Sequence, residues 1–192
     1  GRITHGCPGL WCDSQIPSHA KVAQFALRNG AIPAIQLGHA GRKGGMQRPW
    51  HGNGPLNTAD FERGDMPWTP VGPSEIPVAE GWPLPHALTT SEIKNLIKDY
   101  VAAAQRALAA GYKIAEIHGA HGYLVHSFLS PLSNKRNDDY GGNLEGRMRL
   151  ALEITQAVRA VWPENLPLFF RTSAVDGVPE GWSLEDTVIL AH

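Results

Sequence analysis

The chain has 192 residues, of which 42% are hydrophobic and 18% charged, and its formal net charge is -1 at pH 7. This balance is typical of a soluble globular protein and gives no electrostatic reason to expect nucleic acid or an anionic membrane as a partner. No apolar run approaches the roughly 20 residues of a membrane-spanning helix, and the two cysteines, Cys7 and Cys12, are too few for a disulfide framework, so we expect a reducing, cytoplasmic compartment.

The first predicted elements are a helix and a strand. Residues 18–29 place Val22, Phe25 and Ala26 on one face of a helix that a glycine ends. Residues 31–37 are apolar and short, as expected of a buried strand, although the proline within them cannot donate to a sheet. We therefore expect a helix followed by a buried strand.

The segment 41–88 shows no regular pattern and is rich in glycine and proline. It holds Trp50, Trp68 and Trp82. A connection this long is uncommon inside a domain. Two interpretations stay open: a packed excursion over one edge of the domain, or a lid over a site.

The clearest helix follows this segment. Thr89 and Glu92 have the spacing of a capping box, apolar residues recur with the helical period, and Gly111 provides the stop. Residues 114–118 then form a second short apolar strand.

A second β-then-α unit completes the pattern. Asn143 is expected to cap a helix, although Gly146 weakens its first turn by about 1 kcal/mol. Residues 166–171 make a third strand, and Ser183 begins a last helix that has no stop signal. The chain also opens inside what reads as a loop, so both ends look truncated.

Alternating strands and helices, with apolar strands, indicate a parallel α/β sheet. No glycine-rich dinucleotide motif follows any strand, which disfavours a doubly wound nucleotide-binding domain. We therefore expect residues 1–192 to be a fragment of a TIM (β/α)8 barrel, roughly strands 3–5 with their helices and a long rim loop. A complete barrel needs roughly 250 residues.

Each predicted strand turns polar at its carboxyl end. The polar groups are Gln36, His118 with His121, and Arg171. Parallel strands bring these ends to the same rim, where α/β barrels keep their active sites. Two imidazoles can bind one carbonyl or nitro oxygen, and the phenol of Tyr123 has a proton to give.

Each residue alone has a simpler explanation. Gln36 could anchor a loop, Arg171 could be the partner in a buried ion pair, and Tyr123 could simply pack against its neighbours. His118 and His121 are also compatible with core histidines or metal ligands. A catalytic zinc site needs three protein ligands, however, and no carboxylate or cysteine in the sequence is an obvious third ligand. We therefore expect no metal, and the functional interpretation depends on the joint placement of these residues.

Four segments carry a resemblance to a known family: Gln36–Lys43, Glu116–Leu124, Phe128–Arg136 and Asp139–Gly142. They resemble the Old Yellow Enzyme family, in particular its NADPH dehydrogenase branch with the xenobiotic-reductase-like members, and the similarity extends over essentially the whole chain. The resemblance implies a TIM barrel that binds FMN at the carboxyl rim.

The resemblance also implies roles for single residues. Gln36 would bond the pyrimidine edge of FMN, and Arg171 would stabilise the reduced ring. His118 and His121 would bind the activating oxygen of the substrate, and Tyr123 would donate the proton or orient the substrate. NAD(P)H would be a transient hydride donor in a ping-pong cycle, and the lid interpretation of 41–88 would be favoured.

We therefore predict an FMN-dependent NAD(P)H oxidoreductase, an ene reductase that reduces activated C=C bonds of α,β-unsaturated carbonyls. Its partner would be a small electron-poor alkene, with a homo-oligomer possible. Two alternatives stay open: a catalytically silent barrel fragment or ligand-binding module, and a dienoyl-CoA reductase-like or amine dehydrogenase-like flavoenzyme. The polar run 133–142 is expected to be a scaffold for the histidines rather than catalytic.

Overall fold

A three-stranded parallel sheet forms the centre of the computed structural model, which describes all 192 residues. Its strands are β1 (Ala34–Leu37), β4 (Ile114–Gly119) and β5 (Leu168–Thr172), in the order β1-β4-β5. This parallel order confirms the predicted α/β class. One edge of β1 and one edge of β5 have no strand partner, so the sheet is open rather than closed into a barrel.

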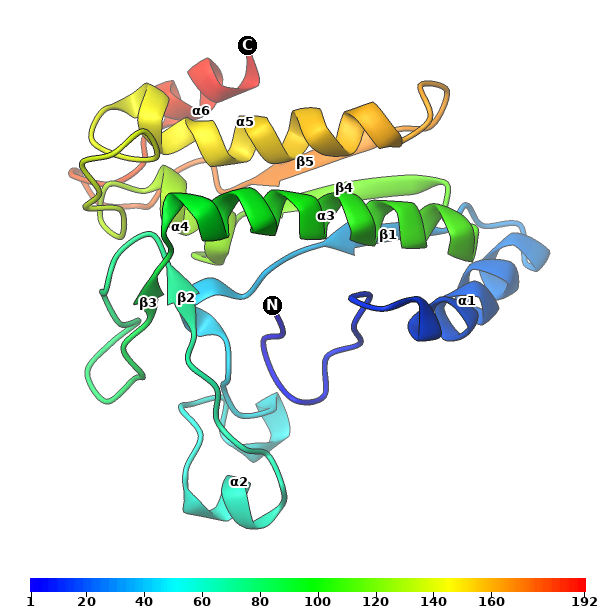
Figure 1. Cartoon of the computed structure of the whole chain (residues 1–192), viewed down its shortest axis with the longest axis horizontal. Helices are drawn as coiled ribbons and strands as arrows, with labels where there is room; N and C mark the ends of the chain where they lie inside the picture. The colour runs from blue at the N-terminus through cyan, green and yellow to red at the C-terminus, as the bar shows by residue number, and fades with distance from the viewer.

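Helices alternate with the strands along the chain: α1 (Ile16–Arg28), α3 (Thr90–Ala110), α4 (Leu124–Leu129), α5 (Leu144–Val161) and α6 (Leu184–Ala191). Figure 1 shows α3 and α5 lying side by side across one face of the sheet, and the two helices contact each other. No helix is both long and apolar enough to cross a membrane. The short α4 was not predicted.

The predicted helix boundaries are confirmed by their caps. The Thr89 side chain accepts from the amide of Glu92, whose carboxylate accepts from the amide of Thr89 in return. Gly111 ends α3 in the left-handed conformation at φ 95°. The side chains of Asn143 and Ser183 cap α5 and α6. Each cap satisfies amides that the first helical turn leaves free.

The core lies between the sheet and the helices. Alternate residues of a strand point to opposite faces, and Ala115 and Ile117 of β4 are fully buried on the helix side. Leu37 and Phe170 are the neighbours of Ile117 in register, and they pack into the same layer. The fully buried helix side chains of this core include Ile93, Ala104, Leu150, Ile154 and Val158.

The predicted face of α1 is wrong. Of the three apolar residues that share one face, Val22 and Phe25 are 61% and 67% exposed and Ala26 is half-buried, whereas Ala23 is completely buried. α1 packs against α3 through this small side chain, which allows a close approach of the two helices. The apolar stripe of α1 therefore points away from the core.

Residues 41–88 form an ordered lobe rather than a structureless loop. The lobe contains α2 (Thr58–Glu62) and a small parallel pair, β2 (Val71–Gly72) with β3 (His86–Ala87). Figure 1 shows α2 at the far end of the lobe from the sheet. Its centre is polar: Gln47 donates to the buried carboxylate of Asp60 at 2.7 Å. Internal polar contacts of this kind explain how so long a connection stays ordered.

The start of α5 corrects the interpretation of Gly146. A β-carbon at Gly146 would lie 2.2 Å from the carbonyl oxygen of Gly141, so the helix packs directly on the preceding loop. The glycine therefore permits a close backbone contact that any larger residue would disrupt.

Candidate active site

Polar side chains occupy the face of the sheet opposite the helices. Gln36, Glu116 and Phe169 are neighbours in register across the three strands, and His118 and Arg171 form the next neighbouring pair. Because alternate residues share a face, these side chains line one surface. Gln36 and Arg171 are exposed on it, whereas His118 is only 7% exposed. The structure therefore brings together the three strand-end residues singled out by the sequence.

Glu116 orients the amide of Gln36. Gln36 Nε2 donates a hydrogen bond to Glu116 Oε1. A carboxylate accepts and does not donate, so the amide nitrogen must face Glu116 and Oε1 of Gln36 is left to accept elsewhere. The sequence interpretation assigned no role to Glu116, although its position two residues before His118 places it on the same face.

The two histidines and the tyrosine converge. The ring of His118 lies 5.1 Å from that of His121 and 5.2 Å from that of Tyr123, between centroids, and His121 and Tyr123 are 6.5 Å apart. All three pairs meet edge to face, so no two rings stack on each other. The three rings therefore lie close enough together to contact one small ligand.

A tight left-handed turn connects β4 to α4. His121 has φ 60° and Gly122 has φ 70°. Glycine adopts this conformation freely, but at His121 it costs roughly 1 kcal/mol. Tyr123 then precedes α4 as its N-terminal cap position. The turn directs the histidine and the tyrosine toward His118 instead of continuing the strand.

Three side chains from separate parts of the chain hold this turn. Lys43 Nζ donates to the carbonyl oxygen of His121 at 2.6 Å. The amide of His121 donates to Ser173 Oγ at 3.0 Å, and the amide of Gly122 donates to His126 Nδ1 at 2.7 Å. None of the three was singled out as a site residue: Lys43 and Ser173 are distant from the turn in sequence, and His126, four residues after Gly122, belongs to the unpredicted α4.

His126 is held in turn by Asp176, which follows β5. His126 Nε2 lies 3.0 Å from Asp176 Oδ1, and the two side chains are 7% and 9% exposed. Asp176 Oδ2 accepts from Ser130 Oγ at 2.6 Å and from the amide of Trp182 at 2.7 Å. These two donors fix the carboxylate in place beside the imidazole.

Burial and charge set the protonation of the site. Burial lowers the pKa of His118 below its ordinary value of 6.5, and the nearby His121 and Arg171 lower it further, against the opposing effect of Glu116. His118 is therefore a neutral imidazole at neutral pH. Burial raises the pKa of the Tyr123 phenol above 10.0, with a smaller contribution from Cys7. The phenol therefore keeps its proton.

A cavity of about 470 Å³ adjoins these groups. Its lining includes Gln36, His118 and Tyr123 together with residues of the segment 1–11, of α3, and of β1 and the loop that follows it. The cavity runs along the edge of β1 that has no strand partner. Its volume is in the range of sites for small organic ligands.

The donor groups fit a flat, heteroaromatic ligand better than a metal ion. No group of three or more His, Cys, Asp or Glu side chains is arranged to hold a metal, so the zinc alternative gains no support. In contrast, Gln36 and Arg171 provide planar hydrogen-bonding groups, and His118 Nδ1 has no partner within the chain. Such groups suit ring nitrogens and carbonyl oxygens.

Comparison with known proteins gives consistent results. A model of the NADH:flavin oxidoreductase / NADH oxidase family matches residues 1–191. The chain is 43% identical over 203 residues to an NADH:flavin oxidoreductase of Gibberella zeae, and 40% identical over 191 residues to an NADPH dehydrogenase of Bacillus cytotoxicus. Each alignment covers 100% of this chain and 49% of the relative, so the chain spans about half the length of these relatives.

Solved structures of similar fold include three enzymes. A 2-naphthoyl-CoA reductase in complex with 2-naphthoyl-CoA matches with a TM-score of 0.84 at 28% identity, covering 100% of this chain and 28% of that one. Histamine dehydrogenase from Rhizobium sp. 4-9 matches with a TM-score of 0.76 at 29% identity, and the match covers 95% of this chain and 25% of that one. Morphinone reductase in complex with tetrahydroNAD matches with a TM-score of 0.72 at 30% identity, and the match covers 90% of this chain and 48% of that one. The open sheet is thus part of the α/β barrel of these proteins.

Proposed function

This chain belongs to the NADH:flavin oxidoreductase / NADH oxidase family, and from that premise we propose that the whole protein is an FMN-dependent NAD(P)H oxidoreductase. Family membership confirms the resemblance to the Old Yellow Enzyme family. We further propose, as the substrate class, α,β-unsaturated carbonyls and similar electron-poor alkenes, whose C=C bond the enzyme reduces.

One observation carries this proposal. The rings of His118, His121 and Tyr123 converge at 5.1 to 6.5 Å beside the polar sheet face that bears Gln36 and Arg171. A pair of imidazole N–H groups suits one oxygen atom, and a phenol beside them suits proton donation. The planar groups on the adjacent face suit the edge of an isoalloxazine ring.

In this proposal each side chain has a defined task. FMN, when bound, would supply the hydride-transfer chemistry between NAD(P)H and the alkene. Gln36, oriented by Glu116, holds the pyrimidine edge of the ring through its amide. Arg171 provides a fixed positive charge on the same face. His118 and His121 hold the carbonyl oxygen of the substrate, which withdraws electron density from its double bond.

Tyr123 is the proposed proton donor. Because burial raises its pKa above 10.0, the phenol is protonated across the neutral pH range and has a proton available for the α-carbon of the substrate. Lys43 Nζ lies 5.6 Å from the centre of the Tyr123 ring, over its face. This cation favours the negative charge that develops on the phenol oxygen as the proton leaves.

The test is to purify the full-length protein and examine its flavin. We expect the yellow absorbance of bound FMN, bleaching by NADH or NADPH, and return of the colour when 2-cyclohexen-1-one is added without oxygen, with cyclohexanone as the product. A preparation that stays colourless after FMN is added contradicts the proposal and favours the silent barrel or simple binding module.

A second candidate is a flavoenzyme that reduces unsaturated acyl-CoA thioesters. The match to 2-naphthoyl-CoA reductase over the whole of this chain supports it. The same reoxidation assay distinguishes the two substrate classes: an enoyl-CoA that restores the flavin colour much faster than 2-cyclohexen-1-one favours this candidate.

Three further expectations stay predictions: that segment 41–88 acts as a lid, that the protein is cytoplasmic, and that it forms a homo-oligomer. The lobe does reach the site at its root, because Lys43 contacts His121. Its far end with α2 lies away from the sheet (Figure 1), so a lid would have to be formed by the residues near Lys43 rather than by α2.

A further inference from the structure

The turn at His121 and Gly122 needs an explanation beyond the proposed chemistry. Its first residue is a histidine in the left-handed conformation, which is intrinsically unfavourable for a residue with a side chain. A conformation of this kind persists only where its surroundings hold it. The orientation of the His121 ring depends directly on this backbone conformation.

The holding contacts come from three different loops and helices. Lys43 belongs to the connection after β1, His126 to α4, and Ser173 to the connection after β5. Together they bond the amide of His121, its carbonyl oxygen and the amide of Gly122, which are all the polar backbone atoms of this turn except the last carbonyl.

We propose that Lys43, His126 and Ser173 are positioning residues that hold the His121–Gly122 turn and thereby aim the second imidazole of the oxygen-binding pair. This inference rests on the proposed function, because it assigns His121 to substrate binding. The three residues, called the turn clamp below, act through His121 and touch neither substrate nor cofactor in this role.

The hydrogen bond from Gly122 and the nearby Asp176 determine which ring nitrogen of His126 carries the proton. Because the amide of Gly122 donates to His126 Nδ1, that nitrogen carries no proton, and the neutral ring carries its proton on Nε2. Nε2 lies 3.0 Å from Asp176 Oδ1, although the two atoms do not meet the geometry of a hydrogen bond. In the opposite tautomer, the Nδ1–H group of His126 would face the N–H group of Gly122, and neither group could accept a hydrogen bond. The nearby carboxylate favours a proton on Nε2 electrostatically, which is the tautomer that the hydrogen bond from Gly122 requires.

Lys43 adds a second constraint. Its Nζ bonds the carbonyl oxygen of His121 and also lies over the Tyr123 ring. A β-carbon at Gly122 would lie 3.1 Å from this Nζ, so the glycine leaves the space that the lysine fills. One cation thus contacts both the backbone of His121 and the ring of Tyr123.

The test uses full-length flavoprotein and measures the dissociation constant of phenol, a neutral oxygen ligand, by the change that it causes in the FMN spectrum. We expect Lys43→Met and His126→Leu to weaken phenol binding about tenfold each, the usual effect of losing one hydrogen bond to a charged or buried group. Ser173→Ala is expected to weaken it about twofold. FMN content should match that of the wild type in all three.

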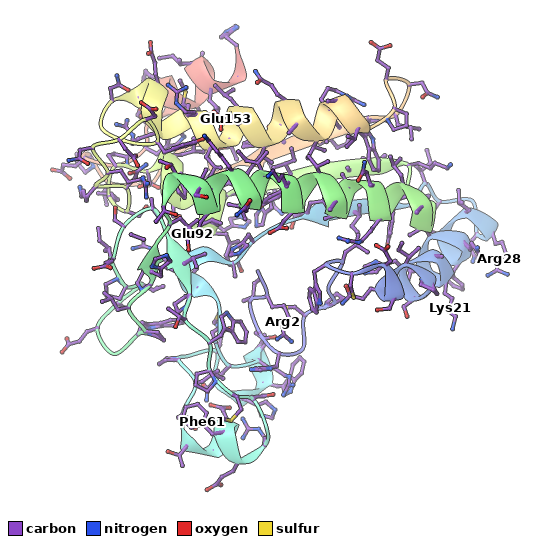
Figure 2. The ribbon with its side chains drawn as sticks, viewed as in Figure 1. Arg2, Lys21, Arg28, Phe61, Glu92 and Glu153 are labelled. Atoms are coloured by element: carbon purple, nitrogen blue, oxygen red, sulfur yellow. The ribbon has the colours of Figure 1, made fainter.

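Two control variants separate the clamp from general damage. His126→Asn places a side-chain oxygen close to the position of Nδ1, so it keeps an acceptor for Gly122 and is expected to stay within about twofold of wild type. Lys21→Met removes an exposed lysine of α1, labelled in Figure 2 and distant from the turn, and is expected to change nothing.

A double variant tests whether Lys43 acts through His121. In a His121→Ala background, Lys43→Met is expected to weaken phenol binding less than twofold further. A full tenfold loss in that background would show that Lys43 acts through Tyr123 or on the ligand itself rather than through His121, and it would overturn the positioning role. Unchanged binding in Lys43→Met and His126→Leu would overturn the clamp as well.

A readout independent of the flavin keeps the two proposals distinguishable. In 15N-histidine NMR spectra, the signals of His126 are assigned by their loss in His126→Asn. We expect these signals to show a proton on Nε2 and none on Nδ1. Asp176→Asn should change this pattern. A proton on Nδ1 in the wild type contradicts the clamp. A wild-type protein that binds no FMN contradicts the proposed function and not the turn geometry.

Discussion

The two faces of the central sheet follow opposite rules although the same strands build them. On the helix side, Ile117 is fully buried and its neighbours in register are apolar. On the other side, the adjacent residues Glu116 and His118 have Gln36 and Arg171 as neighbours. Successive residues of one strand thus serve stability and chemistry in alternation.

This difference explains how the sheet can carry a polar surface that contributes little to the free energy of folding. Leucine and isoleucine side chains under α3 and α5 supply the burial that stabilises the domain, so the opposite face is free to carry groups that contribute little to folding. Substitutions on the two faces should therefore separate stability from ligand binding.

The largest effect is expected from Ile117→Ala in the full-length protein. Removing a buried isoleucine side chain leaves a cavity and should lower the free energy of unfolding by about 3 kcal/mol. Glu116→Ala, one residue earlier on the polar face, should lower it by less than about 1 kcal/mol. Urea denaturation measures both, and equal losses would contradict the division of the two faces.

A nearly equal effect, on binding alone, is expected from the double variant His118→Ala, His121→Ala. Loss of two hydrogen bonds to one oxygen should raise the dissociation constant of phenol about a hundredfold, or roughly 2.7 kcal/mol. FMN should stay bound, because neither ring is assigned to the cofactor. Unchanged phenol affinity would refute the role given to the histidine pair.

A third, smaller effect is expected at the close contact of α5 with its preceding loop. Gly146→Ala forces a methyl group against the carbonyl oxygen of Gly141, so it should destabilise the protein by about 2 kcal/mol despite the better helix propensity of alanine. Gln156→Ala, exposed on the same helix, is the control. Stabilisation by Gly146→Ala would show that propensity prevails and that the loop moves aside.

The smallest effect concerns pH. Burial lowers the folded-state pKa of both His118 and His126 below 6.5, although Asp176 opposes the shift at His126 and Lys43 and His121 reinforce it. Below 6.5 the unfolded chain therefore binds more protons than the folded one, so stability falls as the pH is lowered from 7 toward the folded pKa values.

Each histidine contributes at most about 1.4 kcal/mol per pH unit to this loss. Urea denaturation at pH 7 and at pH 5.5 measures it. His126→Asn has no imidazole to titrate and should show a shallower dependence than the wild type. An equal slope in the two proteins would exclude His126 as a contributor.

Sequence reasoning succeeded where signals are local. The capping box at Thr89, the caps at Asn143 and Ser183, and the polar ends of the three strands were all predicted and all found. It failed where packing decides: Phe25 has the spacing of a core residue and is exposed. The order inside segment 41–88 also depends on contacts such as Gln47 with Asp60, which no local pattern announces.

By itself, the sequence determined which residues reach the rim, because the alternation of strand residues and the parallel βα order follow from local patterns. Only the tertiary structure decided how His121 and Tyr123 are aimed, since Lys43, Ser173 and Asp176 come from distant segments, although His126 lies only four residues after Gly122. The physical reason is that a left-handed histidine is unfavourable alone, and the bonds that hold it exist only after folding has brought three loops together.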